Sequence, residues 1–326
     1  MPNEAPLSPE LQHDYQQQAA MLANKVKKQY RHLRKRFSKQ QITVFRLYDW
    51  EIPEIRAVVD WYGGHLVIGE YTRKQSTPQW LPIMGNAVAR ALEVPPEKVH
   101  LKQRYYGAAD GNRYQRIAHT NQMIVVTERD LQFYVNPRDY VDTGLFADHR
   151  NTRQMVREAS RGKHFLNLFC YTGTFSCYAA KGGAHTTTSV DRSQTAIAWT
   201  RRNMALNAIG GEQHRTIQTH VFDFLSKAEG KTTRYDLAVV DPPSFYTQRS
   251  REDHFDIVRD HPELLNAVIR LMRPGATIWF SSNHQQFTPQ MAAVKASEIL
   301  EITRVTIPED YVHKRKQIHR CWRITV

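Results

Sequence analysis

Cysteine is scarce in this sequence: only Cys170, Cys177 and Cys321 occur among its 326 residues. Their odd number and the lack of a CxxC pair argue against a disulfide framework and a zinc knuckle, so we expect reduced thiols and no bound metal. Long apolar runs are also missing, since no window offers the ~18 uncharged apolar residues that a bilayer crossing needs. Residues 1–9 have neither the basic start nor the apolar middle of a secretory signal. These absences predict a cytoplasmic protein that does not enter a membrane.

Acidic residues are outnumbered, because 32 Asp and Glu stand against 45 Lys and Arg and the formal net charge is +13. A field of this sign attracts polyanions over long distances, so nucleic acid is the partner that the composition indicates. Composition alone leaves a second interpretation open, in which the protein is basic and has no nucleic acid partner.

The N-terminal region, residues 1–40, is predicted to contain a polar, disordered lead-in of about twenty residues followed by a basic helix. Apolar residues recur every three or four positions between Leu22 and Phe37, which is helical spacing. The segment 25–39 holds eight basic residues and no acid. Such a helix repels itself unless phosphates screen it, so we expect it to bind RNA. The residues expected to do so are Lys27, Lys28, Arg31, Arg34, Lys35 and Arg36. A basic face that is merely solvated remains the alternative.

Residues 41–137 are predicted to form a small α+β RNA-binding domain. Strands are expected at 42–48, 56–61, 66–71, 99–105, 123–127 and 131–135, with a helix at 80–92. Aromatic and basic residues, a combination found at single-stranded RNA sites, gather at its expected tips. They are Arg104, Tyr105, Tyr106, Arg113, Tyr114 and Arg116.

Residues 138–326 alternate between strand and helix patterns, which indicates βαβ units and a parallel sheet. The fold class is therefore predicted as α/β, with a Rossmann-like sheet following the smaller α+β domain and the basic helix. The expected strands are 164–169, 186–191, 216–221, 237–241, 277–282, 302–307 and 319–326. The expected helices are 175–181, 193–208, 253–272 and 289–299.

The loop after strand 164–169 is the expected cofactor site, since a doubly wound sheet binds adenosine-bearing cofactors where a strand meets its following helix. Gly173 allows a tight turn and a close approach of the backbone to a ligand. It is the only glycine there, so a GxGxxG dinucleotide cradle is absent. Asp191 closes the next strand, where a carboxylate can bind both ribose hydroxyls. Its alternative role is to cap the helix near Ser193.

Two further acidic positions follow later strands. Asp223 is expected to meet an adenine amino group while Phe222 or Phe224 packs the ring, and a helix cap is again the alternative. After the fourth strand, Asp241 precedes two consecutive prolines, which fix the backbone and cannot continue a sheet. The aromatic residue that follows them can stack on a planar base. A proline stop after a buried strand would explain the prolines but neither the acid nor the aromatic. The predicted target-site residues are Asp241, Pro242, Pro243 and Phe245.

With these motifs the sequence resembles the guanine-N7 half, or K half, of the bifunctional 23S rRNA methyltransferase K/L (RlmKL) family, a class I group. The resemblance runs from about Leu22 to the C-terminus. It rests on Tyr48-Asp49 with Ile52-Pro53, Asp142-Thr143-Gly144-Leu145-Phe146 with Asp148-His149-Arg150, Leu166-Asn167-Leu168-Phe169 with Tyr171-Thr172-Gly173, Asp241-Pro242-Pro243-Ser244-Phe245, Glu252-Asp253 with Phe255-Asp256, Arg259-Asp260-His261, Ser282-Asn283, and Gln317-Ile318-His319 with Cys321-Trp322.

The resemblance implies that S-adenosylmethionine is the cofactor, that the segment Asp142–Arg150 caps it, and that Asp241–Phe245 frame a guanine. The complete predicted cofactor set is Phe169, Tyr171, Thr172, Gly173, Asp191, Arg192, Ser193, Asp223, Phe224, Asp142, Phe146 and Arg150. The expected activity is methylation of guanine N7 in 23S ribosomal RNA or a large-subunit precursor. Because the family members are fused to a second methyltransferase, a separate partner protein supplying that half is also expected.

Two alternative functions remain at this point. A cytosine-C5 methyltransferase of ribosomal RNA would share the fold, but it would need a cysteine near the diproline motif, where Val240 and Ser244 stand. A non-catalytic RNA-binding or ribosome assembly factor could also retain the fold, although the complete set of acids argues against it.

Overall fold

The computed structural model describes residues 7–72, 76–105, 116–230, 232, 234–246, 255–313 and 316–326, with the backbone alone at 104, 105, 245 and 246. Within these residues the chain divides into two compact units. The first holds the described chain up to Tyr105 together with Val126–Asp130, and the second holds 116–125 and the chain from Leu131 onward. In the described parts, no helix combines the length and the hydropathy that a bilayer crossing requires.

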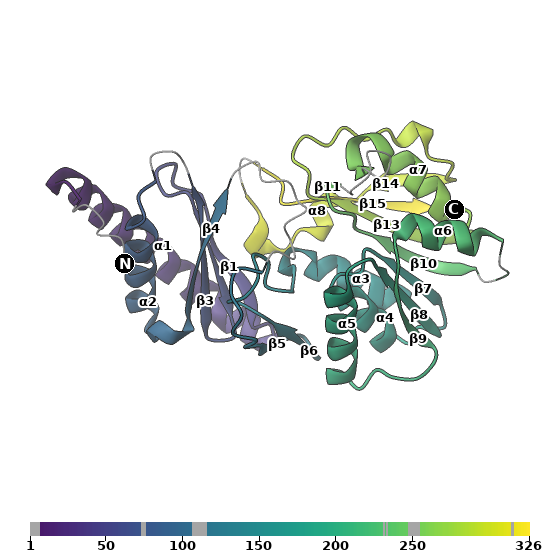
Figure 1. The fold of residues 1–326 in the computed structure, drawn as a ribbon, viewed down its shortest axis with the longest axis horizontal. Helices are drawn as coiled ribbons and strands as arrows, with labels where there is room; N and C mark the ends of the chain where they lie inside the picture. Colours follow the sequence, from purple (N-terminus) through teal and green to yellow (C-terminus); the bar gives the residue numbers. More distant parts are fainter. Residues whose placement is uncertain are drawn as a thin grey trace. The chain divides into compact units, whose positions relative to one another are not determined.

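The first unit is a four-stranded sheet with two helices packed on one face (Figure 1). Its strand order is β1-β2-β3-β4, in which only the β3–β4 pair is parallel. Alternate strand residues such as Phe45, Val59 and Ile68 face the helices and form one apolar core with them. The elements are α1 (Pro9–Lys39), β1 (Val44–Asp49), β2 (Ala57–Tyr62), β3 (His65–Thr72), α2 (Trp80–Leu92) and β4 (Val99–Tyr105).

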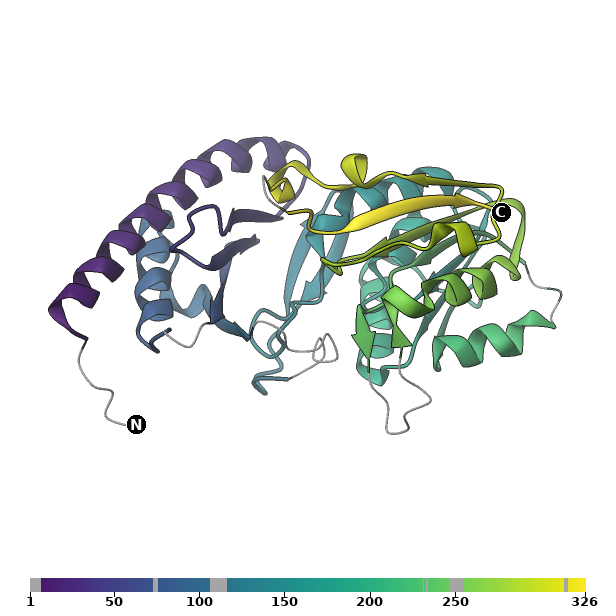
Figure 2. The same ribbon diagram turned by 90° about the horizontal axis from the view of Figure 1, so that it is seen from above.

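The expectation of a disordered lead-in was wrong for the described residues before Leu22, because α1 is one continuous helix from Pro9, seen along its length in Figure 2. Ser8 caps it by accepting a hydrogen bond from the Leu11 amide at 3.3 Å. Tyr15 and Ala19 continue the buried stripe toward the N-terminus. The Trp80 indole N–H also donates to Gln18 at 2.8 Å, so tertiary contacts order a polar segment that lacks strong helical periodicity.

The second unit is built on a seven-stranded sheet of order β14-β15-β13-β10-β7-β8-β9. The five strands from β13 to β9 are parallel, and β15 runs antiparallel to both of its neighbours. The strands are β7 (His164–Leu168), β8 (Thr186–Asp191), β9 (His214–Gln218), β10 (Tyr235–Val240), β13 (Met272–Ser282), β14 (Glu298–Glu301) and β15 (Arg320–Thr325). Two small sheets pair β5 (Ile124–Glu128) with β6 (Leu131–Val135) and β11 (Phe245–Tyr246) with β12 (Phe255–Asp256). The predicted α/β class with a Rossmann-like sheet is confirmed.

Helices cover both faces of this sheet (Figure 1). In β10, Leu237 and Val239 contact the cluster that contains helix α4, whereas Ala238 and Val240 contact the cluster that contains α6 and α7. Burial on both faces explains why the strands read as almost continuous apolar runs. The helices are α3 (Arg150–Ala159), α4 (Thr174–Lys181), α5 (Gln194–Leu206), α6 (Val221–Glu229), α7 (Ile257–Ile269) and α8 (Thr303–Thr306).

Two predictions near the C-terminus were wrong. The helix expected at 289–299 is an irregular segment leading into β14, because Asn266 replaces helical hydrogen bonds: its side chain donates to Ala293 O and accepts from Lys295 N. The strand expected at 302–307 is the short helix α8. There the Thr306 hydroxyl donates to Thr303 O at 2.8 Å, a local bond that favours a helical turn over a strand.

Candidate functional site

The carboxyl ends of β7, β8, β9 and β10 meet at one edge of the parallel sheet, and this edge carries the predicted cofactor and target residues. β7 pairs with β8 on one side and with β10 on the other. The strands that follow β7 in sequence are therefore added first on one side of it and then on the other, which makes β7 the topological switch point. Loops that follow the strands at such a switch point diverge and leave room for a ligand.

The loop after β7 has an unusual backbone. Phe169, Tyr171 and Gly173 all have positive φ, at 56°, 51° and 74°. Two of them are aromatic residues, for which the left-handed region is strained, and such strain is concentrated at functional sites. The Thr200 hydroxyl of α5 fixes the loop by donating to Tyr171 O at 2.9 Å. A Cβ on Gly173 would lie 2.4 Å from Thr200 Cγ2, so packing against the protein itself already requires glycine here.

Asp191 ends β8 beside this loop and is 5% exposed. Its carboxylate accepts from the Tyr171 amide at 3.0 Å and from the Ser193 amide at 2.8 Å. The N-cap of α5 is Ser193, whose hydroxyl accepts from Ala196 N, so the cap role considered for Asp191 belongs to Ser193. A carboxylate oxygen can accept more than one hydrogen bond. Asp191 therefore ties the cofactor loop to β8 and has the chemistry to bind ribose hydroxyls as well.

The other residues predicted around Asp191 differ in exposure. Arg192 is exposed and Ser193 is half-buried. Asp223 was expected just past a strand, but it lies in the first turn of α6 and is exposed. Phe224 packs into the apolar core, whereas Phe222 is only partly buried and contacts Phe255 at 6.1 Å between ring centroids. Of the two aromatic residues considered for an adenine contact, Phe222 is therefore the more accessible.

The segment Asp142–Arg150 contacts the cofactor loop. The Thr172 hydroxyl donates to Gly144 O at 2.6 Å, and the rings of Phe146 and Tyr171 lie 5.3 Å apart. Asp142 is half-buried. Arg150, in contrast, is 2% exposed and forms a buried ion pair with Asp310, so its visible role is to join α3 to the C-terminal segment.

The diproline segment follows β10 directly. Asp241 is held by the Ser281 hydroxyl, which donates to its Oδ1 at 2.7 Å, and its side chain is 22% exposed. Pro242 is buried and Pro243 half-buried. The Ser244 hydroxyl donates to Asn283 at 2.9 Å, which fixes the segment to the end of β13. The backbone of Phe245 begins β11, while its side chain lies outside the described part of the structure, as do Glu252 and Asp253.

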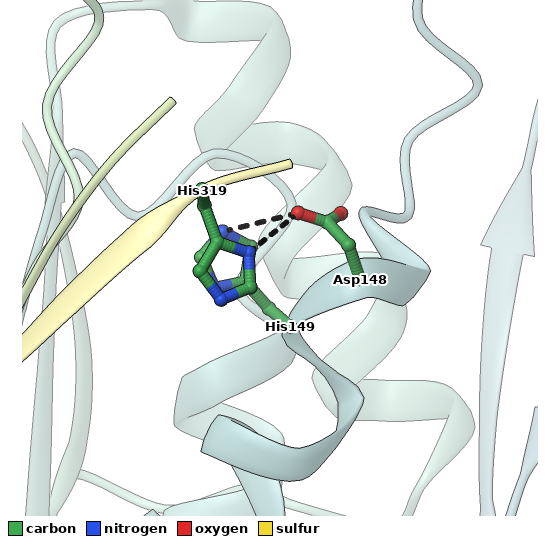
Figure 3. Close-up of side chains that lie close together, drawn as sticks. All are labelled: Asp148, His149 and His319. Atoms are coloured by element: carbon green, nitrogen blue, oxygen red, sulfur yellow. Dashed lines mark hydrogen bonds and ion pairs between the residues drawn. The ribbon is translucent and has the colours of Figure 1, made fainter. Parts of the chain in front are cut away.

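Next to Asp241 lies a buried polar cluster whose three members the sequence did not bring together. It consists of Asp148, His149 and His319 (Figure 3). His319 Nδ1 lies 3.0 Å from Asp148 Oδ2, and the two imidazole rings stack at 4.4 Å with an interplanar angle of 10°. His149 Nε2 lies 3.7 Å from Asp148 Oδ2 and 3.9 Å from Asp241 Oδ2.

These donor atoms are near enough to one another to suggest a metal site, but the ring geometry argues against one. A metal ion binds imidazole along the nitrogen lone pair, in the plane of the ring. Because the two rings are nearly parallel and stacked, no position beside their nitrogens lies in both ring planes. An ion could thus be ligated in plane by only one of the two histidines, and we assign no metal to the cluster.

All three cysteines are buried, and none has the character of a nucleophile. Cys321 pairs across the sheet with Ser281, the partner of Asp241, so the thiol is nearer to the diproline segment than its sequence position indicates. Burial raises the pKa of the Cys321 thiol and raises that of Cys177 to about 12. A cytosine-C5 enzyme needs an accessible thiolate, which none of these residues provides.

In the first unit, five of the six basic residues predicted to bind RNA are exposed along α1, and Arg36 is half-buried. The guanidinium of Arg34 lies over the Tyr30 ring and that of Arg36 over the Phe37 ring. Among the predicted tip residues, Tyr106, Arg113, Tyr114 and the side chains of Arg104 and Tyr105 lie outside the described residues. Arg116, in the second unit, pairs with Asp139 at 3.3 Å.

Comparison with solved structures supports the fold assignment. A protein assigned as a methyltransferase, SMU.776, in complex with S-adenosylhomocysteine has a TM-score of 0.75 and 21% identity, covering 100% of this chain and 83% of that one. A protein from Streptococcus mutans assigned as a SAM-dependent methyltransferase has a TM-score of 0.72 and 20% identity, with the same coverage.

Comparison with curated proteins finds relatives over most of the chain. Ribosomal RNA large subunit methyltransferase K of Neisseria meningitidis is 38% identical over 93% of this chain and 86% of its own length. The K/L proteins of Magnetococcus marinus and Methylococcus capsulatus are each 39% identical over 94% of this chain. This chain spans only 43% and 42% of their lengths. Residues 58–311 match the family described as S-adenosylmethionine-dependent methyltransferases, which agrees with the cofactor predicted from the sequence. The chain therefore belongs to the S-adenosylmethionine-dependent methyltransferase family.

Proposed function

We propose that this protein transfers a methyl group from S-adenosylmethionine to N7 of a guanine in 23S ribosomal RNA. The observation that carries the proposal is the 38% identity to a ribosomal RNA large subunit methyltransferase K, 86% of which is covered by the chain. The N7 position follows from the family resemblance of the sequence motifs, and the geometry at the sheet edge is consistent with it.

Asp191 and the Phe169–Gly173 loop are the proposed core of the cofactor site. When bound, S-adenosylmethionine supplies an electrophilic methyl group on a positively charged sulfur. Asp191 would bind the ribose hydroxyls, and its bonds to the Tyr171 and Ser193 amides hold its carboxylate in place for that purpose. Phe146 would cover the cofactor from the segment that already contacts the loop.

Asp241 and the prolines after it are the proposed target site. Guanine N7 exposes a lone pair, so it needs no general base, and catalysis is mainly a matter of placing the base in line with the methyl group. The bond from Ser281 keeps Asp241 Oδ1 in position. The carboxylate would bind the guanine edge and offset the positive charge that the base gains on methylation. Phe245 would stack on the base, which must be single-stranded or flipped out because the major groove of duplex RNA is too narrow to enter.

Helix α1 is the proposed RNA-binding element. Lys27, Lys28, Arg31, Arg34 and Lys35 are exposed, which is the arrangement that phosphate contacts require. With ribosomal RNA as its substrate, the protein would act in the cytoplasm.

The test compares wild type with Asp241→Ala on 23S RNA from a strain that lacks the gene. Wild type should restore one 7-methylguanine, detected by mass mapping of RNA digests. Asp241→Ala should bind S-adenosylhomocysteine nearly as tightly as wild type by calorimetry and transfer no methyl group. If wild type restores no 7-methylguanine, the proposed function is wrong. If Asp241→Ala keeps its activity, Asp241 has no part in the mechanism.

A further inference from the structure

The buried cluster of Asp148, His149 and His319 has a feature that the proposed chemistry leaves unexplained. His149 is 5% exposed, and its Nδ1 atom has no hydrogen-bond partner among the described residues. Buried polar atoms are nearly always paired, so an unpaired one requires an explanation. The other ring nitrogen, Nε2, faces two carboxylates at 3.7 Å and 3.9 Å, both beyond hydrogen-bond range.

The surroundings of His149 select its tautomer. Carboxylates can only accept hydrogen bonds when ionised, so the proton belongs on Nε2, which faces Asp148 and Asp241. Nδ1 then carries only a lone pair, and a buried acceptor without a partner is tolerated better than a buried donor. A neutral imidazole with its proton on Nε2 fits both nitrogens.

The ring should also remain uncharged at neutral pH. Desolvation lowers the pKa of His149, with further lowering by His319 and Arg153, while the charges of Asp148 and Asp241 act in the opposite direction. Packing fixes the plane of the ring, because His319 stacks on it and the Phe175 ring lies edge-to-face with it, at 5.8 Å between ring centroids.

The two carboxylates beside His149 are not equivalent. Asp148 Oδ2 already receives the hydrogen bond from His319 Nδ1 at 3.0 Å (Figure 3). Asp241 is bonded through Oδ1 to Ser281, and its Oδ2 is the atom that faces His149. A movement of roughly 1 Å would bring His149 Nε2 and Asp241 Oδ2 within hydrogen-bond range.

We propose that His149 is a positioning residue for Asp241. Its Nε2–H bonds Asp241 Oδ2 when the methyl acceptor is bound, while Ser281 holds Oδ1, so the carboxylate is fixed from two sides. The Asp148–His319 pair supports His149, because His319 stacks on its ring and is itself held by the hydrogen bond to Asp148 Oδ2. A neutral donor leaves the negative charge of Asp241 available for the guanine, whereas a charged imidazolium would cancel it. The catalytic consequence rests on the proposed function, but the placement of His149 Nε2 beside Asp241 Oδ2 does not.

The first test needs no RNA. Nitrogen NMR of isotope-labelled histidine in the full-length protein, with the His149 signal assigned by its loss in His149→Gln, reports which nitrogen carries the proton. We expect the Nε2–H tautomer, and we expect Asp241→Asn to shift the His149 Nε2 resonance. An Nδ1–H tautomer would overturn the proposal whatever the substrate is, because Nε2 would then have no proton to donate to Asp241.

The second test measures methyl transfer by three variants. His149→Phe keeps a flat ring for stacking on His319 but has no donor, and kcat should fall about 10- to 100-fold with little change in KM for S-adenosylmethionine. His149→Gln restores a neutral donor and should recover most of that loss. The matched control is His164→Gln, a half-buried histidine at the amino end of β7, which should retain wild-type kcat.

The outcomes separate the two proposals. Wild-type kcat in His149→Phe would refute the positioning role. A loss of kcat that His149→Gln does not recover would also count against it, because that pattern indicates a packing role. If NMR shows the Nε2–H tautomer while wild type methylates no ribosomal RNA, His149 can still donate to Asp241. In that case only the proposed substrate is wrong.

Discussion

Asp191 shows how one side chain can serve both structure and ligand binding. It accepts hydrogen bonds from the backbone amides of Tyr171 and Ser193, so its negative charge stabilises the strained loop as well as facing the proposed ribose site. A neutral replacement of the same size should therefore weaken cofactor binding without creating a cavity in the core.

Asp191→Asn tests this interpretation. The amide has one acceptor oxygen and places its NH2 group against a backbone donor, so it cannot satisfy both amides. A hydrogen bond to a charged group is worth about 1.5–3 kcal/mol, so Kd for S-adenosylhomocysteine should rise about 10- to 100-fold. Isothermal calorimetry measures this. Asp236→Asn is the control, because Asp236 lies at the opposite edge of the sheet, where it accepts from His164 N and Arg273. Equal Kd values for the two variants would remove Asp191 from the cofactor site.

Gly173 allows a second test, because the chain contains a control glycine with nearly the same φ angle. Gly173 has φ +74° and its added Cβ would strike Thr200, whereas Gly162 has φ +72° and open space around it. Gly162→Ala should cost only left-handed strain, about 1–2 kcal/mol. Gly173→Ala should cost about 1–3 kcal/mol more from overpacking. Urea unfolding monitored by circular dichroism measures the difference, and equal losses would show that Thr200 moves aside freely.

At the scale of elements, sequence patterns placed α2, β4, β6 and β8 at their observed bounds. These elements have clear apolar periods. Helix α3 was missed because it buries charged and polar residues instead: Arg153 is 1% exposed, lies over the rings of Phe175 and Tyr178, and donates to Phe146 O. Such burial depends on neighbours distant in sequence and leaves no periodic apolar signal.

The candidate site, like the fold, could be predicted from the sequence only in part. The sequence could place Asp191 and Asp241 at one sheet edge, because both follow strands of a parallel sheet. The pairing of Asp148 with His319 could not be predicted, since 171 positions separate them and only the folded sheet brings them together. Asp223 was misplaced because a strand was expected at 216–221, whereas Val221 already begins α6 and forms its buried side with Phe224 and Leu225.

Helix α1 allows a prediction that separates RNA binding from mere solvation. Lys28, Arg31 and Lys35 are exposed on one side of the helix. Replacing all three by Gln should weaken binding to an rRNA fragment and lower the slope of log K against log salt, by about 0.7–0.9 for each phosphate that the variant no longer neutralises. Fluorescence anisotropy over a salt series measures both.

The control for this experiment removes the same number of charges elsewhere. Arg161, Lys163 and Lys181 are exposed at the amino edge of the parallel sheet. Their triple Gln variant has the same net charge as the α1 variant and should bind RNA nearly as wild type does. If both variants lose affinity equally, the total charge of the protein drives binding and α1 has no particular role.

At the scale of the whole molecule, the chain contains separate apolar cores. One joins α1 and α2 to the four-stranded sheet, and others lie on the two faces of the seven-stranded sheet. All predicted cofactor residues belong to the second unit. A ligand bound there stabilises directly only the core that carries its site, so the two units should respond differently to it.

Hydrogen exchange with S-adenosylhomocysteine tests this expectation. At about 100 times its Kd the ligand should stabilise the unit that binds it by ~2.7 kcal/mol. Amides of β7 and β8 that exchange by unfolding of that unit should therefore slow about 100-fold. Amides of β2 and β3 belong to a different core and should exchange as before. With Asp191→Asn at the same ligand concentration, the slowing in β7 and β8 should shrink in proportion to the loss of affinity. Equal slowing in both sheets would show that the two units unfold together, because protection can reach β2 and β3 only if their opening requires the seven-stranded sheet to open too.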